Sequence, residues 1–309
     1  MNSIVGQLKR EWLEHRMAFF WGPGAVLIIV LLAGLVAAFA NNHADVELSI
    51  SQQRELSEVI EANPVTGDMG AMEVVAAMAL DVAGSTDEEL RQKIHGLQFG
   101  LAQPFHLVFL VIAAVALLGG LYDERKDHSV LFWKSMPVSD VQSIASKVVF
   151  VLWLAPLVTI AAILVAQFLA LVLTSLYVED GMAGRLWAAS GFWMRPFELL
   201  VGYLVLGALL LPFAAWLMLV SSRAGRLPFL WALGVPWALV VVERIFFGTS
   251  GLGRAISGHI DLLRVFQPSH EGVWAPLSAF AEPRMWGGLL VAGLLLSGAA
   301  YCRRRYIEL

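Results

Sequence analysis

Residues 121–140, LYDERKDHSVLFWKSMPVSD, form a charged block between two long apolar runs. The acidic and basic side chains of the block nearly cancel one another, and four consecutive apolar residues, 130–133, stand among them. Apolar runs that cross a bilayer on both sides would hold the block close to the membrane, as a short loop or an interfacial helix. Its aromatic pair, Phe132 and Trp133, is then either an anchor for a partner protein or an ordinary contact with lipid headgroups.

The composition of the whole chain is that of an integral membrane protein. Of the 309 residues, 58% are hydrophobic and only 15% are charged, and the mean hydropathy is +0.71. Soluble domains carry about 25% charged residues.

A net charge of -4 with dispersed lysines and arginines argues against nucleic acid as a partner. The single cysteine, Cys302, cannot form an internal disulfide. We expect no cleavable signal peptide, because the first apolar run starts near Ala18, exceeds a signal sequence in length and lacks a cleavage site.

Apolar and polar runs divide the chain into a predicted order of segments. We expect an amphipathic interfacial helix at 1–17, a first span at 18–40, an extracytoplasmic helical cap at 41–103, a second span at 104–122, a cytoplasmic segment at 123–147 and four further spans within 148–309. The predicted fold is therefore all-α, with six transmembrane helices. Glycine and proline interrupt apolar segments at 248–284, which predicts short re-entrant helices there.

Local signals refine these boundaries. The sequence Gly22-Pro23-Gly24 predicts a turn near the start of the first span. Ser85 with Glu88, and Ser139 with Gln142, match capping boxes. The first box would open a short helix of the cap, and the second would open a helix that continues into the third span. Prolines inside spans predict kinks at Pro156, Pro212 and Pro236.

The distribution of lysine and arginine predicts the orientation. With six spans, the basic residues of the N-terminal segment, the second and fourth connections and the C-terminus all fall on one side. The positive-inside rule then places both termini and the charged block in the cytoplasm. The acidic segment 41–103 lies on the other side, where acidic faces are usually just solvated.

Catalytic motifs are mostly missing from the sequence. It contains no H-E-x-x-H pair, no clustered cysteine and histidine ligands for a metal and no phosphate-binding loop for a nucleotide. Residues 248–251, GTSG, fit the pattern of intramembrane serine proteases, with His259 or His270 as candidate bases. Residues 252–261 are not the apolar helix that would seat such a serine, so a serine protease is a disfavoured interpretation.

Three further candidates are ionisable residues in or beside spans. Glu243 and Arg244, near the outer end of the fifth span, are candidates for the translocation path or an outer gate. They could equally snorkel to the interface or pair locally. His106, within the second span, is expected to be a packed or interfacial histidine and not a ligand.

The block, together with the downstream Lys147, closely resembles the segment between the second and third spans of bacterial permease subunits of type-2 ATP-binding-cassette (ABC) transporters. Members of this group read much like ERKD-S-LFWKS-PVSD, and the likeness is sharp over about 25 residues. It implies a surface-lying N-terminal helix, six spans, a cytoplasmic coupling helix in the second connection and short re-entrant helices before the last span. The chain would then be a non-enzymatic half of an exporter in the bacterial inner membrane.

The resemblance also implies partners. ATP and magnesium would bind a separate ATPase subunit, so this chain would hold no cofactor, and a second permease subunit, identical or related, would complete the path. The ATPase contact would comprise Asp123, Glu124, Arg125, Asp127, Phe132, Trp133 and Lys134. We expect the two aromatic residues to be buried anchors and Glu124, Arg125 and Asp127 to fix the register of the contact. Closure of two ATPase subunits would push the block 121–140. The kinked spans would convert this movement to alternating access.

The competing interpretation is a non-transporting membrane scaffold or sensor subunit that uses the same block to dock a cytoplasmic regulator. An ATPase encoded beside the gene would favour transport, and a regulatory protein there would favour the scaffold. The acidic segment 41–103 is longer than the family requires, so it would cap the exit or bind an external partner. The apolar spans fit lipids, peptides and hydrophobic drugs alike, so no substrate is indicated.

Overall fold

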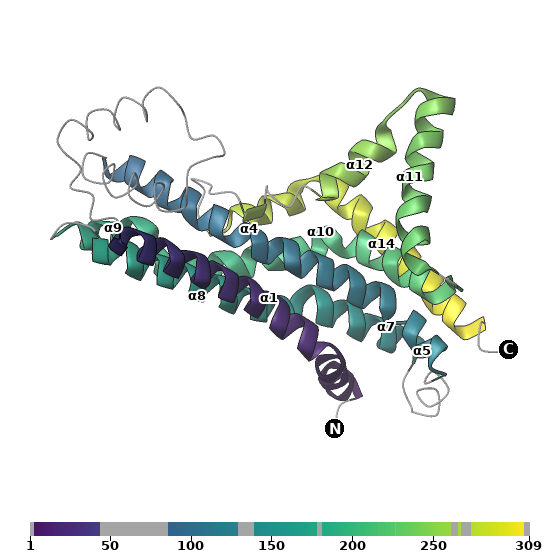
Figure 1. The fold of residues 1–309 in the computed structure, drawn as a ribbon. Helices are drawn as coiled ribbons and strands as arrows, with labels where there is room; N and C mark the ends of the chain where they lie inside the picture. Colours follow the sequence, from purple (N-terminus) through teal and green to yellow (C-terminus); the bar gives the residue numbers. More distant parts are fainter. Residues whose placement is uncertain are drawn as a thin grey trace. The chain divides into compact units, whose positions relative to one another are not determined.

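The computed structural model describes residues 3–43, 86–128, 139–177, 181–225, 227–260, 265–266 and 273–305. Within these ranges the regular secondary structure is helical throughout, as Figure 1 shows. Six of the helices are long and apolar enough to cross a membrane. The predicted all-α fold with six potential spans is therefore confirmed at this level, which indicates a multi-pass membrane protein.

The helices have the following bounds. In chain order they are α1 (Ser3–His43), α4 (Asp87–Gly119), α5 (Tyr122–Lys126), α7 (Asp140–Val149), the π-helical turn η1 (Phe150–Leu154), α8 (Pro156–Tyr177), α9 (Met182–Ser190), the 3-10 turn η2 (Phe192–Met194), α10 (Arg195–Arg223), α11 (Pro228–Phe247), α12 (Gly251–Ile260), the 3-10 helix η3 (Ala275–Ala281) and α14 (Pro283–Arg305). The chain forms two compact units. Unit 1 comprises Met1–Pro23, Ala102–Ala162 and Trp193–Leu309, and unit 2 comprises Gly24–Leu101 and Ile163–Phe192.

Unit 1 is built around the long pair α10 and α14, which pack along each other (Figure 1). Its aromatic core joins helices far apart in the sequence: the Phe19 ring lies 5.8 Å from the Phe150 ring and 6.4 Å from the Phe109 ring, between centroids. Glycine makes two close approaches possible in this unit. A Cβ atom on Gly22 would lie 2.2 Å from Ile112 Cδ1, and one on Gly207 would lie 2.5 Å from the indole nitrogen of Trp153. Neither position can take a larger residue without displacing its neighbour.

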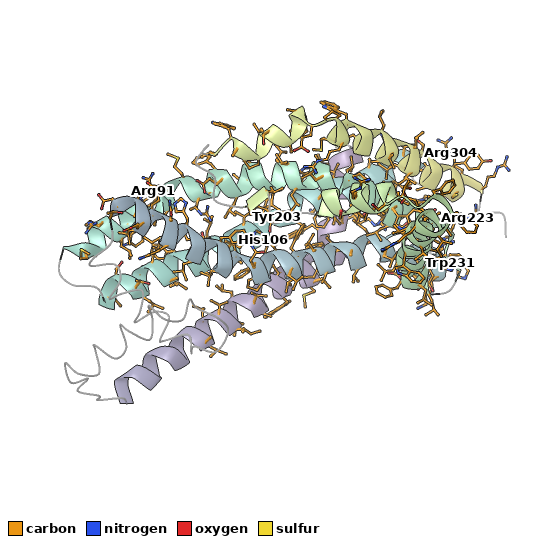
Figure 2. All side chains as sticks on the ribbon, turned by 90° about the horizontal axis from the view of Figure 1, so that it is seen from above. Arg91, His106, Tyr203, Arg223, Trp231 and Arg304 are labelled. Carbon is orange, nitrogen blue, oxygen red and sulfur yellow. The ribbon has the colours of Figure 1, made fainter. Side chains whose placement is uncertain are left out.

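Large apolar side chains cover much of the outside of unit 1. On α11, for example, Trp231 is 58% exposed and Trp237 is 70% exposed, and Figure 2 shows Trp231 pointing outward. Soluble proteins rarely expose continuous apolar surface of this kind. An apolar exterior on helices of spanning length is expected for contact with lipid tails.

Unit 2 has a core of its own. Leu90 and Ile94 of α4, Leu171 of α8 and Leu186 of α9 are all buried and pack together. Arg185 adds an ion pair to Asp87 at 2.6 Å, but the Asp87 side chain is 86% exposed, so this pair contributes little stability.

One predicted interruption of a helix is wrong. α1 runs from Ser3 to His43 and continues through Gly22-Pro23-Gly24, where a turn was expected. α4 begins at Asp87 and runs through Pro104, while the start of the second membrane span at residue 104 stays a prediction. In membrane helices, neighbouring groups can satisfy the backbone carbonyl that a proline leaves free, so proline marks a boundary less reliably there. Most of the predicted cap, residues 44–85, lies outside the described residues.

The two predicted capping boxes differ in outcome. At the start of α7, Ser139 Oγ accepts from the Gln142 N–H and the Gln142 side chain accepts from the Ser139 N–H, as predicted. The earlier box is one residue later than expected: Thr86 and Glu89 exchange the two hydrogen bonds. This box opens α4 itself instead of a separate short helix.

The third predicted span stays helical from Asp140 to Leu176, with a widened turn inside it. At the end of η1 the Ala155 N–H donates to the Phe150 carbonyl, one residue further back than in an α-helix. Pro156 follows immediately, and its missing N–H and bulky ring disfavour a regular α-helical turn before it. The other two prolines, Pro212 and Pro236, lie inside α10 and α11.

Candidate functional site

The structure describes four of the seven residues predicted to contact an ATPase. Asp123, Glu124 and Arg125 lie on α5, and Asp127 is its C-cap. Asp123 and Asp127 are exposed, whereas Glu124 is buried. The other three residues, Phe132, Trp133 and Lys134, lie outside the described residues.

Glu124 is the centre of a buried ion-pair network in unit 1. Its Oε1 lies 2.8 Å from Arg10 Nη2 and 3.2 Å from Lys147 Nζ, and its Oε2 lies 3.0 Å from Arg303 Nη2. The side chains of Glu124, Lys147 and Arg303 are at most 7% exposed. One carboxylate therefore joins four helical segments: α1, α5, α7 and α14.

A second set of acidic groups balances the three cations. Glu11 Oε1 lies 3.0 Å from Lys147 Nζ, Glu14 Oε1 lies 2.8 Å from Arg10 Nε and Asp140 Oδ1 lies 3.2 Å from Arg303 Nε. Arg303 also donates from Nη1 to Ser143 Oγ at 2.8 Å. Burial of charge is costly unless each charge is paired and hydrogen-bonded, and here each of the three cations meets at least two carboxylates. The network therefore fixes these helices in one arrangement.

Arg125 fastens α5 to the end of α10. Its Nη2 donates to the Ser221 carbonyl at 2.7 Å and to the Ala224 carbonyl at 2.9 Å. The Ser221 hydroxyl oxygen accepts from the N–H groups of Leu121 and Tyr122, both at 3.0 Å. The last carbonyls of a helix have no partners within it, so an arginine at this place satisfies groups that would otherwise be unpaired. The ATPase contact predicted for Glu124 and Arg125 stays a prediction, since both side chains here bind within the chain.

Most of this network is not predicted from the sequence. Glu11 falls within the predicted amphipathic helix at 1–17, and Arg303 falls among the C-terminal basic residues that predict the orientation. The signal for Lys147 was its place within the apolar sequence SKVVF, where a lysine needs a nearby carboxylate. The pairing itself joins residues more than 100 positions apart, and such contacts leave no trace in local spacing.

A cation site beside the network is disfavoured. Glu11, Glu14 and His15 place possible ligand atoms within 4.8 Å of one another. The ammonium group of Lys147, however, already lies 3.0 Å from Glu11 and 4.0 Å from Glu14. A metal ion at this place would have to displace that lysine.

Glu243 binds the start of the following helix. Its Oε1 accepts from Thr249 Oγ1 at 2.8 Å and from the Gly251 N–H at 2.7 Å, and its Oε2 accepts from the Leu252 N–H at 2.9 Å. The carboxylate thus satisfies free N–H groups at the positive end of α12. Arg244 is exposed. Local pairing of Glu243 is confirmed, and the outer-gate role of both residues stays a prediction.

The remaining sequence candidates fall as follows. His106 is a packed histidine: its Nδ1 lies 2.7 Å from the Tyr203 hydroxyl, and its ring stacks on Phe266 at 4.1 Å (Figure 2 labels His106 and Tyr203). Two short helices, α12 and η3, occupy the predicted re-entrant region, while re-entry into a bilayer stays a prediction. The candidate bases of the hydrolase interpretation, the side chain of His259 and all of His270, lie outside the described residues.

Comparisons with models of known protein families, with curated proteins and with solved structures find no match to this chain.

Proposed function

We propose that this chain is the membrane-spanning permease subunit of an ATP-driven exporter of the type-2 ABC class, with the ATPase on a separate chain. Six helices of spanning length and the likeness of residues 121–140 to the family's second connection support this proposal. The observation that carries it is the Glu124 network. Glu124 lies on α5, at the start of the connection that would contact the ATPase. The network binds α5 to α1, α7 and α14 of unit 1.

Arg303 links both ends of that connection. Residues 129–138 lie between α5 and α7 in the sequence, and Arg303 pairs with Glu124 on α5 and with Asp140 at the start of α7. A force applied to residues 129–138 would therefore move α5, α7 and the end of α14 together. The widened turn η1 and Pro156 follow α7 at once, and such irregular turns are where helices bend most easily. In this proposal the network is the rigid lever and η1 is the hinge.

The proposal assigns the other functions to partners. ATP and magnesium bind the ATPase subunit, and a second permease, identical or related, encloses the transport path together with this chain. The complex lies in the bacterial inner membrane, with both termini and residues 129–138 in the cytoplasm. Phe132 and Trp133 anchor the ATPase, and the exposed Asp123 and Asp127 steer its approach.

Site-specific photo-crosslinking tests this proposal. A benzophenone amino acid replaces Trp133 in the chain expressed in its native membranes, and the captured proteins are identified by mass spectrometry. We expect one dominant partner, an ATPase with a phosphate-binding loop. The matched control replaces Trp193, an exposed tryptophan of η2 that the proposed orientation places on the other side of the membrane, and it should capture no ATPase.

The same experiment separates the two function classes. A regulatory protein without an ATPase fold at position 133 would overturn the permease proposal in favour of the scaffold or sensor subunit. An ATPase captured equally from both positions would show that the capture is not specific to the second connection, and would also overturn the proposal.

A further inference from the structure

A hydrogen bond between two apolar helices of unit 1 lies beside a proline. The indole Nε1–H of Trp216, on α10, donates to the Ala232 carbonyl of α11 at 2.9 Å. In an unbroken α-helix this carbonyl accepts from the N–H four residues later, at position 236. That position is Pro236, inside α11, and proline has no N–H to donate. Trp216 therefore supplies from α10 the kind of donor that the proline removes from α11.

Apolar surroundings make this bond important to both helices. Ala232 is 4% exposed and packs with Val220 and Ala224 at the end of α10. In such surroundings a carbonyl or an indole N–H without a partner costs free energy. The bond satisfies both groups at once, and it fastens α11 to α10 one turn before Pro236.

The outer part of α11, residues 237–247, has little contact with the rest of the chain. The structure describes α11 throughout, and Ala232 is its only buried residue. Figure 1 shows α11 diverging from α10 and α14 beyond its first turns. Glu243 accepts from N–H groups at the start of α12, which couples α12 to this outer part. The outer part can thus bend at Pro236 without disrupting a packed core.

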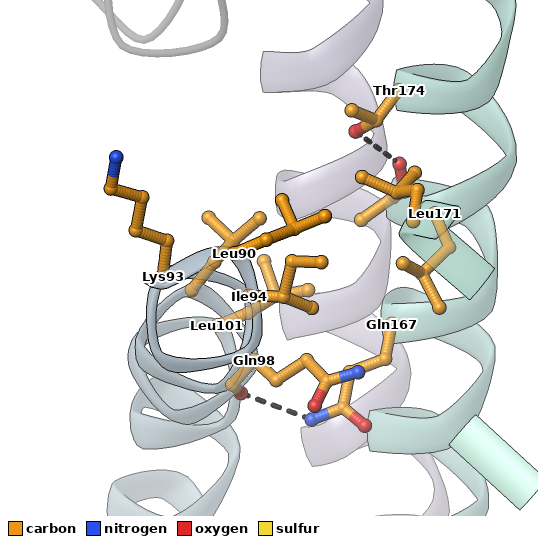
Figure 3. A pocket seen from close by; sticks show the side chains of 11 residues that line it. Leu90, Lys93, Ile94, Gln98, Leu101, Gln167, Leu171 and Thr174 are labelled. Atoms are coloured by element: carbon orange, nitrogen blue, oxygen red, sulfur yellow. Dashed lines mark hydrogen bonds between the residues drawn. The ribbon is translucent and has the colours of Figure 1, made fainter. Parts of the chain in front are cut away.

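The proline distinguishes this bond from a similar one in unit 2. There the amide Nε2 of Gln167, on α8, donates to the Gln98 carbonyl of α4 at 3.0 Å (Figure 3). Ala102, four residues after Gln98, keeps its N–H, so α4 does not depend on the glutamine for a donor at this turn. In α11 the donor from the neighbouring helix replaces one that the sequence lacks.

We propose that Pro236 is a hinge in α11 and that Trp216 restrains its bending. While the indole N–H bonds the Ala232 carbonyl, residues 237–247 keep one direction. A movement of α10 that carries Trp216 away leaves this carbonyl without its donor, and the outer part of α11 then bends at Pro236. The hinge is separate from the Glu124 network and does not depend on the permease proposal.

Distances between pairs of spin labels in the full chain test the hinge. Cys302 is replaced by alanine, and the chain in phosphatidylcholine nanodiscs carries labels at two exposed positions, Leu204 of α10 and Ile245 beyond the hinge. Trp216→Phe removes the indole N–H and keeps an aromatic ring. We expect a second distance for this pair, with the ratio of bent to natural populations raised about tenfold because one hydrogen bond is lost.

Pro236→Ala separates loss of the bond from loss of volume. Alanine at this position restores the N–H that bonds the Ala232 carbonyl within α11, so Trp216→Phe should leave the distance unchanged in this background. The smaller ring is present in both backgrounds, and an effect of packing alone would appear in both. The matched control is Trp231→Phe, which changes an exposed tryptophan next to Ala232 and should leave the distances natural.

A second pair of labels locates the bend. Leu204 and the exposed Leu230 lie on α10 and on the part of α11 before Pro236, and their distance should stay the same in Trp216→Phe. A change at this pair as large as that between Leu204 and Ile245 would mean that all of α11 detaches, and would overturn the hinge.

Three other results would also overturn the proposal. The first is an unchanged distance to Ile245 in Trp216→Phe, and the second is an equal change of that distance in the Pro236→Ala background. The third concerns folding: if Trp216→Phe prevents folding, Pro236→Ala should restore it, and failure to do so would contradict the role assigned to the indole N–H.

Discussion

Replacement of Glu124 by glutamine should destabilise the protein strongly, although the change removes only a charge. The variant keeps the size of the side chain and takes the shared carboxylate away from Arg10, Lys147 and Arg303. Removal of one partner from a buried ion pair costs about 3–5 kcal/mol, because the other charge stays buried without compensation.

The expected cost lies at the lower end of that range. Each cation keeps a second carboxylate within 3.2 Å, in the pairs Arg10–Glu14, Lys147–Glu11 and Arg303–Asp140. We therefore expect Glu124→Gln to lower the free energy of unfolding by about 3 kcal/mol. Unfolding of the purified chain by dodecyl sulfate in mixed micelles, followed by circular dichroism, measures this difference.

Glu14→Gln is the matched control. Glu14 belongs to the same network and pairs with Arg10 at 2.8 Å, but its side chain is 40% exposed. Exposed pairs contribute little, so this variant should cost about 0.5 kcal/mol. Equal effects of the two substitutions would refute the reasoning, because burial of the shared carboxylate would then not matter.

Three further substitutions have expected outcomes. Ser221→Ala leaves the buried N–H of Leu121 and the partly buried N–H of Tyr122 without an acceptor, and should lower the free energy of unfolding by about 1–3 kcal/mol in the same dodecyl sulfate assay. Gly207→Ala forces Trp153 away from α10, so the cost should be about 1–3 kcal/mol, with a shift of the tryptophan fluorescence maximum. Glu243→Gln weakens the cap of α12, which should be visible as faster hydrogen exchange of the α12 amides.

Each of the three has a neighbouring control. Ser222→Ala removes only a hydroxyl that donates to the Leu219 carbonyl of the same helix, so it should be nearly neutral. Gly234→Ala meets no atom within 4 Å and should slightly stabilise α11. Arg244→Gln changes an exposed side chain and should leave the exchange of α12 unchanged. If a control variant changed the measured quantity as much as its paired variant does, the contact tested by that pair would not have the role assigned to it.

The fold was predictable where local sequence decides it. Apolar runs of spanning length fix the six potential spans, and the Ser139–Gln142 box lies where its spacing placed it. The predicted turn at Gly22-Pro23-Gly24 is wrong, because α1 continues through Pro23. A proline inside a helix leaves a backbone carbonyl without a partner. In membrane proteins neighbouring groups can satisfy this carbonyl, so a proline predicts the end of a helix less reliably there than in soluble proteins.

The candidate site was predictable only in part. The likeness of residues 121–140 singled out Glu124, but not its burial or its partners. Arg303 sits in a run of three arginines whose positions indicate orientation and nothing more, yet it alone of the three bridges α5 and α7 in the described structure. Likewise Gln167 is an isolated polar residue in an apolar stretch, and only the fold shows that its side chain donates to the Gln98 carbonyl. Pairing between distant segments follows from packing and not from spacing.

Affinity purification tests the central claim, attachment of a separate ATPase to the second connection, most directly. The tagged chain is isolated from its native membranes beside the variants Phe132→Ala and Trp133→Ala, and the co-eluting proteins are quantified. We predict an ATPase in near-equal amount with the natural chain and its loss from both variants, with the yield of the chain unchanged. Absence of an ATPase from the natural complex, even after mild crosslinking, would contradict the account.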